Sequence, residues 1–138
     1  MSEGLSAGIR MRALGAALWI PPLIWLVSFQ RLAARLGRPR PTPPFEDAAL
    51  ADWVDDILRR LPGPWRYTCL KRAAVLYHLL RGAGRPLQLV IGVRRGPDGK
   101  LGAHAWLLLE HVLYLEPEPQ AAGAHTVIAV FPDPSAAT

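Results

Sequence analysis

The chain has 138 residues, of which 51% are hydrophobic, and a formal net charge of +5. This length is enough for one domain with a modest core. A single cysteine excludes an internal disulfide and any multi-cysteine metal site. The sequence contains no phosphate-binding or dinucleotide-binding glycine motif, and we expect neither a metal nor a cofactor.

The net positive charge of the chain comes entirely from its first third. Residues 1–45 contain six Arg and one Glu, whereas residues 46–138 contain ten basic and ten acidic residues. Because the larger part is formally neutral, the high isoelectric point does not indicate a nucleic-acid-binding domain. We expect no nucleic acid among the partners.

An uncharged apolar run occupies residues 13–30, and its 18 residues are the lower limit for a membrane span. Pro21 and Pro22 interrupt the run, and four arginines follow it. A signal peptide and a short spanning helix therefore remain open. Trp19, Trp25 and the basic flank favour a third group, a helix that lies in a membrane surface or docks on a partner or on its own domain.

A proline-rich segment, residues 38–44, separates this arm from the rest of the chain and favours an extended, semi-rigid spacer. We therefore expect a hydrophobic, basic N-terminal helical arm with its linker at residues 1–44, and a folded domain at residues 45–138. The arm is predicted to dock, in the cytoplasm, on an anionic membrane surface through residues 1–40 or on partner proteins. The alternative is that Leu18–Phe29 packs on the folded domain and completes its core.

Two helices are predicted at the start of the folded domain. Residues 46–61 place apolar side chains on one face and a cluster of aspartates and arginines on a solvated face. The next helix begins at Cys69, with Thr68 as its N-cap, and Gly82 and Gly84 terminate it.

Four strands are predicted to follow, at residues 87–93, 103–109, 112–116 and 126–131. Glu110 and His111 form a two-residue turn, so the second and third strands should pair as a hairpin. Helices followed by antiparallel strands predict an α+β domain.

Cys69 is the first candidate for chemistry. It lies in the first turn of its helix, where unpaired backbone N–H groups and the positive end of the helix dipole gather. Both favour the thiolate, which is the nucleophilic form. From position alone, a small buried hydrophobe remains an equal alternative.

A nucleophilic thiolate needs a general base, and the chain has four histidines. His78 comes nine residues after Cys69, about 180° round the helix, and should face away. His111 lies in the predicted turn and His125 in a loop of small residues. His104 lies on the second strand between two alanines, which leave room around its ring. A helix-start cysteine with a strand-borne histidine is the core of the papain and transglutaminase-like arrangement.

Four collinear segments resemble a known family. They are Cys69-Leu-Lys-Arg-Ala, Leu79-Leu-Arg-Gly-Ala-Gly-Arg-Pro86, Leu89-Val-Ile-Gly-Val-Arg-Arg95 and Ala103-His-Ala-Trp106. Together they resemble the transglutaminase-like B2 proteins of lasso-peptide biosynthesis. The resemblance implies a cysteine protease that removes the leader from a ribosomally made precursor peptide. It implies a papain/transglutaminase-like core behind the N-terminal arm.

The same resemblance implies the partners. In split systems of this family a separate leader-binding protein presents the precursor peptide, and an asparagine-synthetase-like cyclase closes the ring. A chain of 138 residues is too short to hold a leader-binding domain beside the protease, which suits a split system.

The resemblance also implies a third catalytic residue. The family usually has an Asp twelve residues after its His, and here that position is Glu116. A glutamate can orient an imidazole, but a regular hairpin would place Glu116 opposite Ala105, facing away from His104. A bulge, or an early end of the strand, would restore the contact. Glu118 is the fallback, and Glu110 a weaker one.

Two other functions remain open on the same residues. The chain could be a transglutaminase-like acyltransferase that uses the cysteine and histidine with an amine acceptor. It could also be a non-catalytic, membrane-attached scaffold on this fold.

Overall fold

The computed structural model describes residues 5–26, 29–42, 44–62, 68–117 and 119–132. In this part of the chain, helices precede a four-stranded antiparallel sheet, which confirms the predicted α+β class. The elements are α1 (Ala7–Leu26), α2 (Phe29–Leu36), α3 (Asp47–Arg60), α4 (Cys69–Gly82), β1 (Leu87–Arg95), β2 (Leu101–Leu109), β3 (Val112–Leu113), α5 (Pro119–Ala124) and β4 (Thr126–Phe131).

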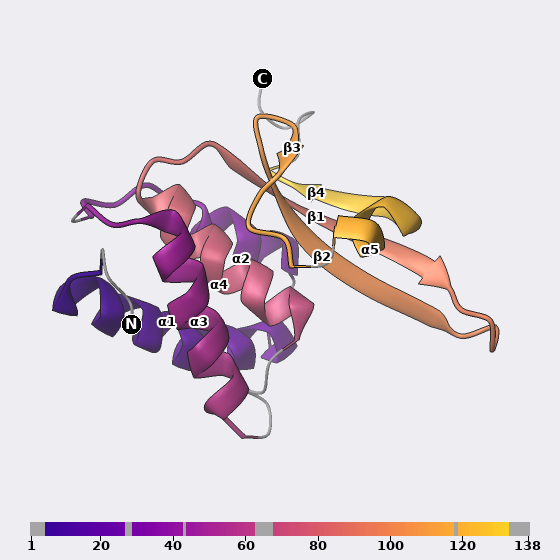
Figure 1. Ribbon diagram of the computed structural model, residues 1–138, viewed down its shortest axis with the longest axis horizontal. Helices are drawn as coiled ribbons and strands as arrows, with labels where there is room; N and C mark the ends of the chain where they lie inside the picture. Colours follow the sequence, from indigo (N-terminus) through magenta and orange to yellow (C-terminus); the bar gives the residue numbers. More distant parts are fainter. Residues whose placement is uncertain (1–4, 27–28, 43, 63–67, 118, 133–138) are drawn as a thin grey trace.

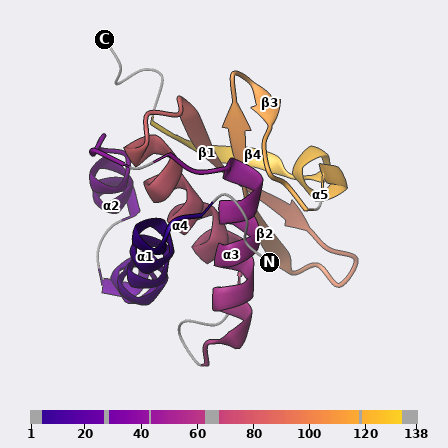
Figure 2. The same cartoon turned by 60° about the vertical axis from the view of Figure 1, so that its left-hand side comes forward.

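The strand order in the sheet is β3-β2-β1-β4, and each neighbouring pair is antiparallel. β1 and β2 form a long central hairpin, in which Ile91 pairs with Ala105 and Gly92 pairs with His104. Helices α1 to α4 lie on one side of the sheet, and the turn of the β1–β2 hairpin projects beyond them (Figures 1 and 2). Side chains that alternate along β1 and β2 therefore face two different environments.

The face toward the helices carries the main core. Ala105 and Leu107 of β2 are buried in the same hydrophobic cluster as side chains from α1, α2, α3 and α4. The opposite face has a small cluster of its own around Val90 and Trp106. Because His104 alternates with Ala105 along β2, its side chain lies on this second face, together with Trp106.

The N-terminal helices complete the main core. Ile9, Ala13 and Ile20 of α1 and Leu36 of α2 are at most 2% exposed, in the cluster that also holds α3, α4 and β1. Helices on both sides of residue 44 thus share one core. This agrees with the alternative in which the apolar run packs on the folded domain instead of docking elsewhere. The domain boundary at that residue stays a prediction.

α1 runs through Pro21 and Pro22, which were expected to interrupt it. Each proline removes one helical N–H bond. These losses fall in the last turns of the helix, and Ile20 and Pro21 are buried, so packing against the core maintains the helical path. Within the described residues, no helix is long and apolar enough to cross a membrane.

The other elements begin and end close to their predicted positions, with two differences. The third strand is short, Val112–Leu113 instead of residues 112–116, and a short helix, α5, lies between the third and fourth strands, where no element was predicted. The first difference bears on the candidate site, because the chain leaves the sheet before it reaches Glu116.

Residues 37–42 cross the C-terminal end of α4 and are held there by polar contacts. The backbone N–H of Arg40 donates to the carbonyl of Gly82 at 2.8 Å, and its Nη2 donates to the carbonyl of His78 at 2.9 Å. The Nδ1–H of His78 donates to the carbonyl of Leu36 at 3.1 Å. Burial, and then the charge of Arg40, lower the pKa of His78 to about 4.

Because the half-buried imidazole of His78 is neutral in the folded protein, we predict that the protein loses stability on acidification. The unfolded chain takes up a proton at His78 near pH 6.5, whereas the folded protein does so only near pH 4. The stabilisation should be fully present above pH 6.5. It should fall by on the order of 2 kcal/mol as the pH approaches 4, after allowance for solvent screening of a part-exposed ring. In urea unfolding, His78→Gln should flatten this slope; equal slopes for the two proteins would contradict the assignment.

Candidate active site

The N-terminus of α4 is built as predicted. The Oγ1 of Thr68 accepts the backbone N–H of Lys71 at 3.2 Å, and the helix begins at Cys69. Cys69 is half-buried, and its Sγ lies 3.9 Å from the carbonyl oxygen of Ala103 on β2. The thiol is therefore next to the residue that precedes His104.

His104 and Glu116 form a direct pair. The Nε2 of His104 lies 2.8 Å from the Oε2 of Glu116, and the two side chains are 9% and 4% exposed. Since a carboxylate accepts, Nε2 carries a proton; when the ring is in its neutral form, Nδ1 therefore keeps its lone pair. A carboxylate twelve residues after the histidine thus lies where it can orient that ring.

Glu116 reaches the histidine because the chain leaves the sheet early. The two-residue turn is present, and Glu110 and His111 have φ values of 52° and 70°, as a type I′ turn requires. β3 then pairs with β2 only as far as Leu113. Leu115 has a φ of 55°, which turns the backbone off the strand path. The contact that a regular hairpin would prevent is thereby made.

Arg72 of α4 fixes the backbone just before Glu116. Its Nη2 donates to the carbonyl of Leu115 at 2.7 Å, and its Nε donates to Oδ1 of Asp55 on α3 at 2.6 Å. The Arg72 side chain is 8% exposed, so this ion pair is only weakly screened by water. Asp55 was expected on a solvated face; it is instead the counter-ion of a buried arginine.

Tyr114 ties the same segment to the start of α3. Its hydroxyl donates to Oδ2 of Asp47 at 2.5 Å, and Asp47 also accepts two N–H groups of Arg85, at 2.8 and 3.3 Å. Burial, and then the hydrogen bond to Asp47, raise the pKa of Tyr114 to about 12, so the hydroxyl remains a donor at neutral pH. The two residues before Glu116 are thus both bound to the helical layer.

Two rings pack against His104 on the sheet face away from the helices. The Trp106 ring is stacked at 5.7 Å between centroids, and the His125 ring is tilted at 5.5 Å. Gly92 leaves space for both, because a Cβ there would lie 2.8 Å from Trp106 and 2.9 Å from His125. His125 was assigned only to a loop. Its local sequence gives no signal, since the contact depends on the pairing of β4 with β1.

The structure brings three of the predicted site residues together. His104 and Glu116 are hydrogen-bonded, and Cys69 contacts the backbone next to them. Within the described residues, no hydrogen bond joins the thiol to the His104 ring. Glu110 is exposed in the turn, and Glu118 lies outside the described residues.

A cavity of about 480 Å³ lies beside Glu116 on the side of α3, and its lining includes neither Cys69 nor His104. Its lining includes Asp52, Arg72, Leu113, Glu116 and Pro117. A volume of this size is in the range that holds a substrate fragment or several side chains of a peptide.

The arrangement can support acyl transfer through a thioester. That chemistry needs an activated thiol, a base with a free nitrogen lone pair, and a group that orients the base. Here the three groups come from α4, β2 and the segment after β3.

Comparison with known proteins agrees with this chemistry. The family model of the transglutaminase-like superfamily matches residues 12–130. The chain belongs to the transglutaminase-like superfamily. No curated protein and no solved structure matches the chain. The superfamily typically includes cysteine peptidases, and membership is compatible with a peptidase or an acyltransferase. The transglutaminase-like region begins within α1, so most of that helix lies inside the matched range.

Removal of Arg72 should destabilise this transglutaminase-like domain. Arg72→Met keeps an apolar stem of similar length but leaves Asp55 and the Leu115 carbonyl without their donor. This should lower the free energy of unfolding by about 2–4 kcal/mol. Adding Asp55→Asn should recover part of the loss, because it removes the unpaired charge.

Urea unfolding of the two single variants and the double variant measures the coupling between the side chains. Arg60→Met is the matched control, because the Arg60–Asp56 pair is largely exposed and should contribute little. Strictly additive effects of the Arg72 and Asp55 substitutions would show that the two side chains act independently.

Proposed function

We propose that this protein is a cysteine protease that removes the leader peptide from a ribosomally made lasso-peptide precursor. The observation that carries the proposal is the buried 2.8 Å hydrogen bond between His104 and Glu116, next to a cysteine at a helix start. Membership of the transglutaminase-like superfamily supports the chemistry. The choice of a leader peptide as substrate rests on the resemblance to the B2 proteins.

In the proposed reaction, Sγ of Cys69 attacks the scissile carbonyl, and its proton passes to Nδ1 of His104. The imidazolium then gives this proton to the leaving amine, and the same nitrogen activates the water that hydrolyses the thioester. Glu116 orients the ring and stabilises its charged form. The backbone N–H of Cys69, at the start of α4, stabilises the oxyanion.

The thiol and the imidazole have to approach each other for this reaction. In free enzymes catalytic hydrogen bonds are often long and tighten when the substrate binds. Cys69 is the first residue of its helix, so a change in its side-chain rotamer alters the position of Sγ without moving the rest of α4. We propose that the bound precursor favours the rotamer that faces His104.

The proposed partners are the precursor peptide, a separate leader-binding protein and an asparagine-synthetase-like cyclase. The proposed location is the cytoplasm, with residues 1–40 docking on the partners or on an anionic membrane. Met11, Leu18 and Trp19 of α1 are exposed, as is Arg12 on the same helix, and these residues supply apolar and basic groups for such contacts.

Cys69→Ala should abolish leader removal and leave the thermal unfolding cooperative, because it removes the attacking sulfur. Cys69→Ser should be nearly as inactive, since a site that activates a thiolate activates a hydroxyl poorly. Mass spectrometry of the precursor, incubated with its partner proteins, measures the reaction. Two peptides indicate hydrolysis, whereas an amine conjugate indicates the acyltransferase alternative. Full cleavage of the precursor in the presence of Cys69→Ala would end the proposal that Cys69 is the protease nucleophile.

Glu116→Gln should lower turnover by roughly 10- to 10⁴-fold, the scale expected when the carboxylate that orients a catalytic histidine is lost. Glu116→Asp keeps the charge and should retain activity or raise it. Glu110→Gln is the matched control, because Glu110 is exposed in the turn, and it should have no effect. If Glu118→Gln is inactive while Glu116→Gln retains full turnover, the wrong carboxylate has been chosen.

A further inference from the structure

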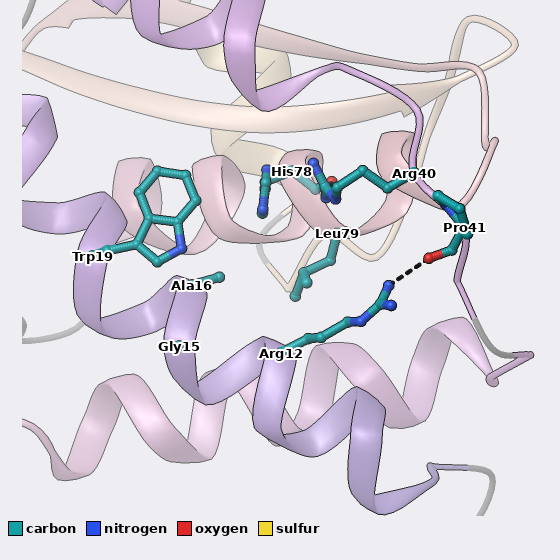
Figure 3. Close-up of a pocket in the computed structure, with 8 residues that line it drawn as sticks. All are labelled: Arg12, Gly15, Ala16, Trp19, Arg40, Pro41, His78 and Leu79. Carbon is teal, nitrogen blue, oxygen red and sulfur yellow. Dashed lines mark hydrogen bonds between the residues drawn. The ribbon is translucent and has the colours of Figure 1, made fainter.

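A second cavity lies between α1 and the C-terminal half of α4, away from the candidate active site. Its volume is about 520 Å³. Its walls include Arg12, Gly15 and Trp19 of α1, and also Arg40 and His78. Figure 3 shows Trp19 at one end, Arg12 at the other, and the Arg40 guanidinium beside His78 on the α4 side. No residue of the proposed catalytic triad lines it.

The cavity wall carries two cations and no anion. Arg12 donates to the carbonyl of Pro41 at 2.8 Å and to the hydroxyl of Thr42 at 3.4 Å. Arg40 donates to the carbonyls of His78 and Arg38. All of these acceptors are neutral, and among the described residues no carboxylate pairs with either guanidinium. Burial lowers the pKa of Arg40, and the charge of Arg12 lowers it further.

The remaining wall adds apolar surface without adding charge. Trp19 is 41% exposed, and its ring meets the His78 ring edge-on, with 5.1 Å between the centroids. The Nδ1–H of His78 is bound to the carbonyl of Leu36, so the neutral ring offers only an acceptor at Nε2. The net charge of the lining is therefore that of the two arginines.

We propose that this cavity binds a carboxylate carried on an apolar stem. A guanidinium has five N–H donors in a planar fork that matches a carboxylate, and the donors of both arginines are only partly used. The volume exceeds that of a bare ion, and the Trp19 ring provides a surface for the stem. Such a group can come from a free organic acid or from an acidic side chain next to an apolar one in a peptide. The proposal does not depend on the protease activity.

The full-length protein is titrated with phenylacetate, with its neutral analogue phenylacetamide, and with phenyl phosphate. A second set of titrations uses the peptide acetyl-Phe-Glu-Phe-amide and its analogue with Gln in place of Glu. Binding is followed by NMR of the indole N–H signals of the five tryptophans, and Trp19→Phe assigns the signal of Trp19. Phenylacetate should shift the Trp19 signal in a saturable way, with an affinity at least about 10-fold higher than that of phenylacetamide.

Two variants locate the site. Arg12→Gln should weaken phenylacetate binding by about 10-fold, because it removes one of the two guanidinium groups. Arg31→Gln, which removes the same charge from an exposed position on α2, should leave binding unchanged. Gly15→Leu should abolish binding by filling the cavity, because a Cβ at Gly15 meets nothing within 4 Å. It should not unfold the protein, since leucine favours a helix more than glycine does.

The outcomes distinguish a peptide ligand from a free organic acid, and a carboxylate from other ligands. Tighter binding of the acidic peptide than of phenylacetate identifies a peptide ligand, and the reverse order identifies a free acid; both support the proposal. Equal binding of phenylacetate and phenylacetamide, equal losses in Arg12→Gln and Arg31→Gln, or retained binding in Gly15→Leu would each overturn it. Tighter binding of phenyl phosphate by about 10-fold or more would overturn the assignment to a carboxylate.

Discussion

The hydrogen bond between His104 and Glu116 is the contact on which the candidate site depends. It forms only because the chain leaves the sheet after Leu113. In a regular hairpin, alternation would direct residue 116 to the helix side while His104 points to the opposite side. The end of β3 at Leu113 and the left-handed backbone of Leu115 remove this conflict. A segment that leaves a β-ladder exposes backbone groups that need new partners. Arg72 supplies one of them, by donating to the Leu115 carbonyl from within the helical layer.

The helical layer therefore does more than cover the sheet. α4 presents Cys69 at its first residue, Arg72 one turn later, and His78 near its other end, where the chain from α2 crosses it. The position of α4 in turn depends on α1, whose buried side chains pack in the same core. The N-terminal segment contains no candidate catalytic residue. Nevertheless, the packing of Ile9 and Ile20 helps to fix the helix that carries the thiol.

Features set by local rules were predictable, and features set by distant contacts were not. The start of α4 follows from Thr68 as an N-cap, and the hairpin turn follows from its length and the flanking strand patterns. By contrast, Asp55 appears solvated when its own helix is considered alone; only the packing of α4 makes it the partner of Arg72. His125 meets His104 because β4 pairs with β1, which no local pattern encodes. The family resemblance implied Glu116 at this position, but not the backbone path that brings it to the histidine.

The short third strand links these observations. β1 covers β2 along its whole length, whereas β3 pairs with only Leu108 and Leu109, so in the described chain the other edge of β2 has no strand partner near Ala103. The thiol of Cys69 contacts the Ala103 carbonyl at this open edge. Had β3 continued in the same register, residue 116 would have paired with Ala105, and the strand would have occupied the approach to that edge. The same early end of β3 therefore redirects Glu116 toward His104 and leaves room for α4 to bring a thiol beside the strand that carries the histidine. A longer hairpin, although more regular, would have kept the three groups of the candidate site apart.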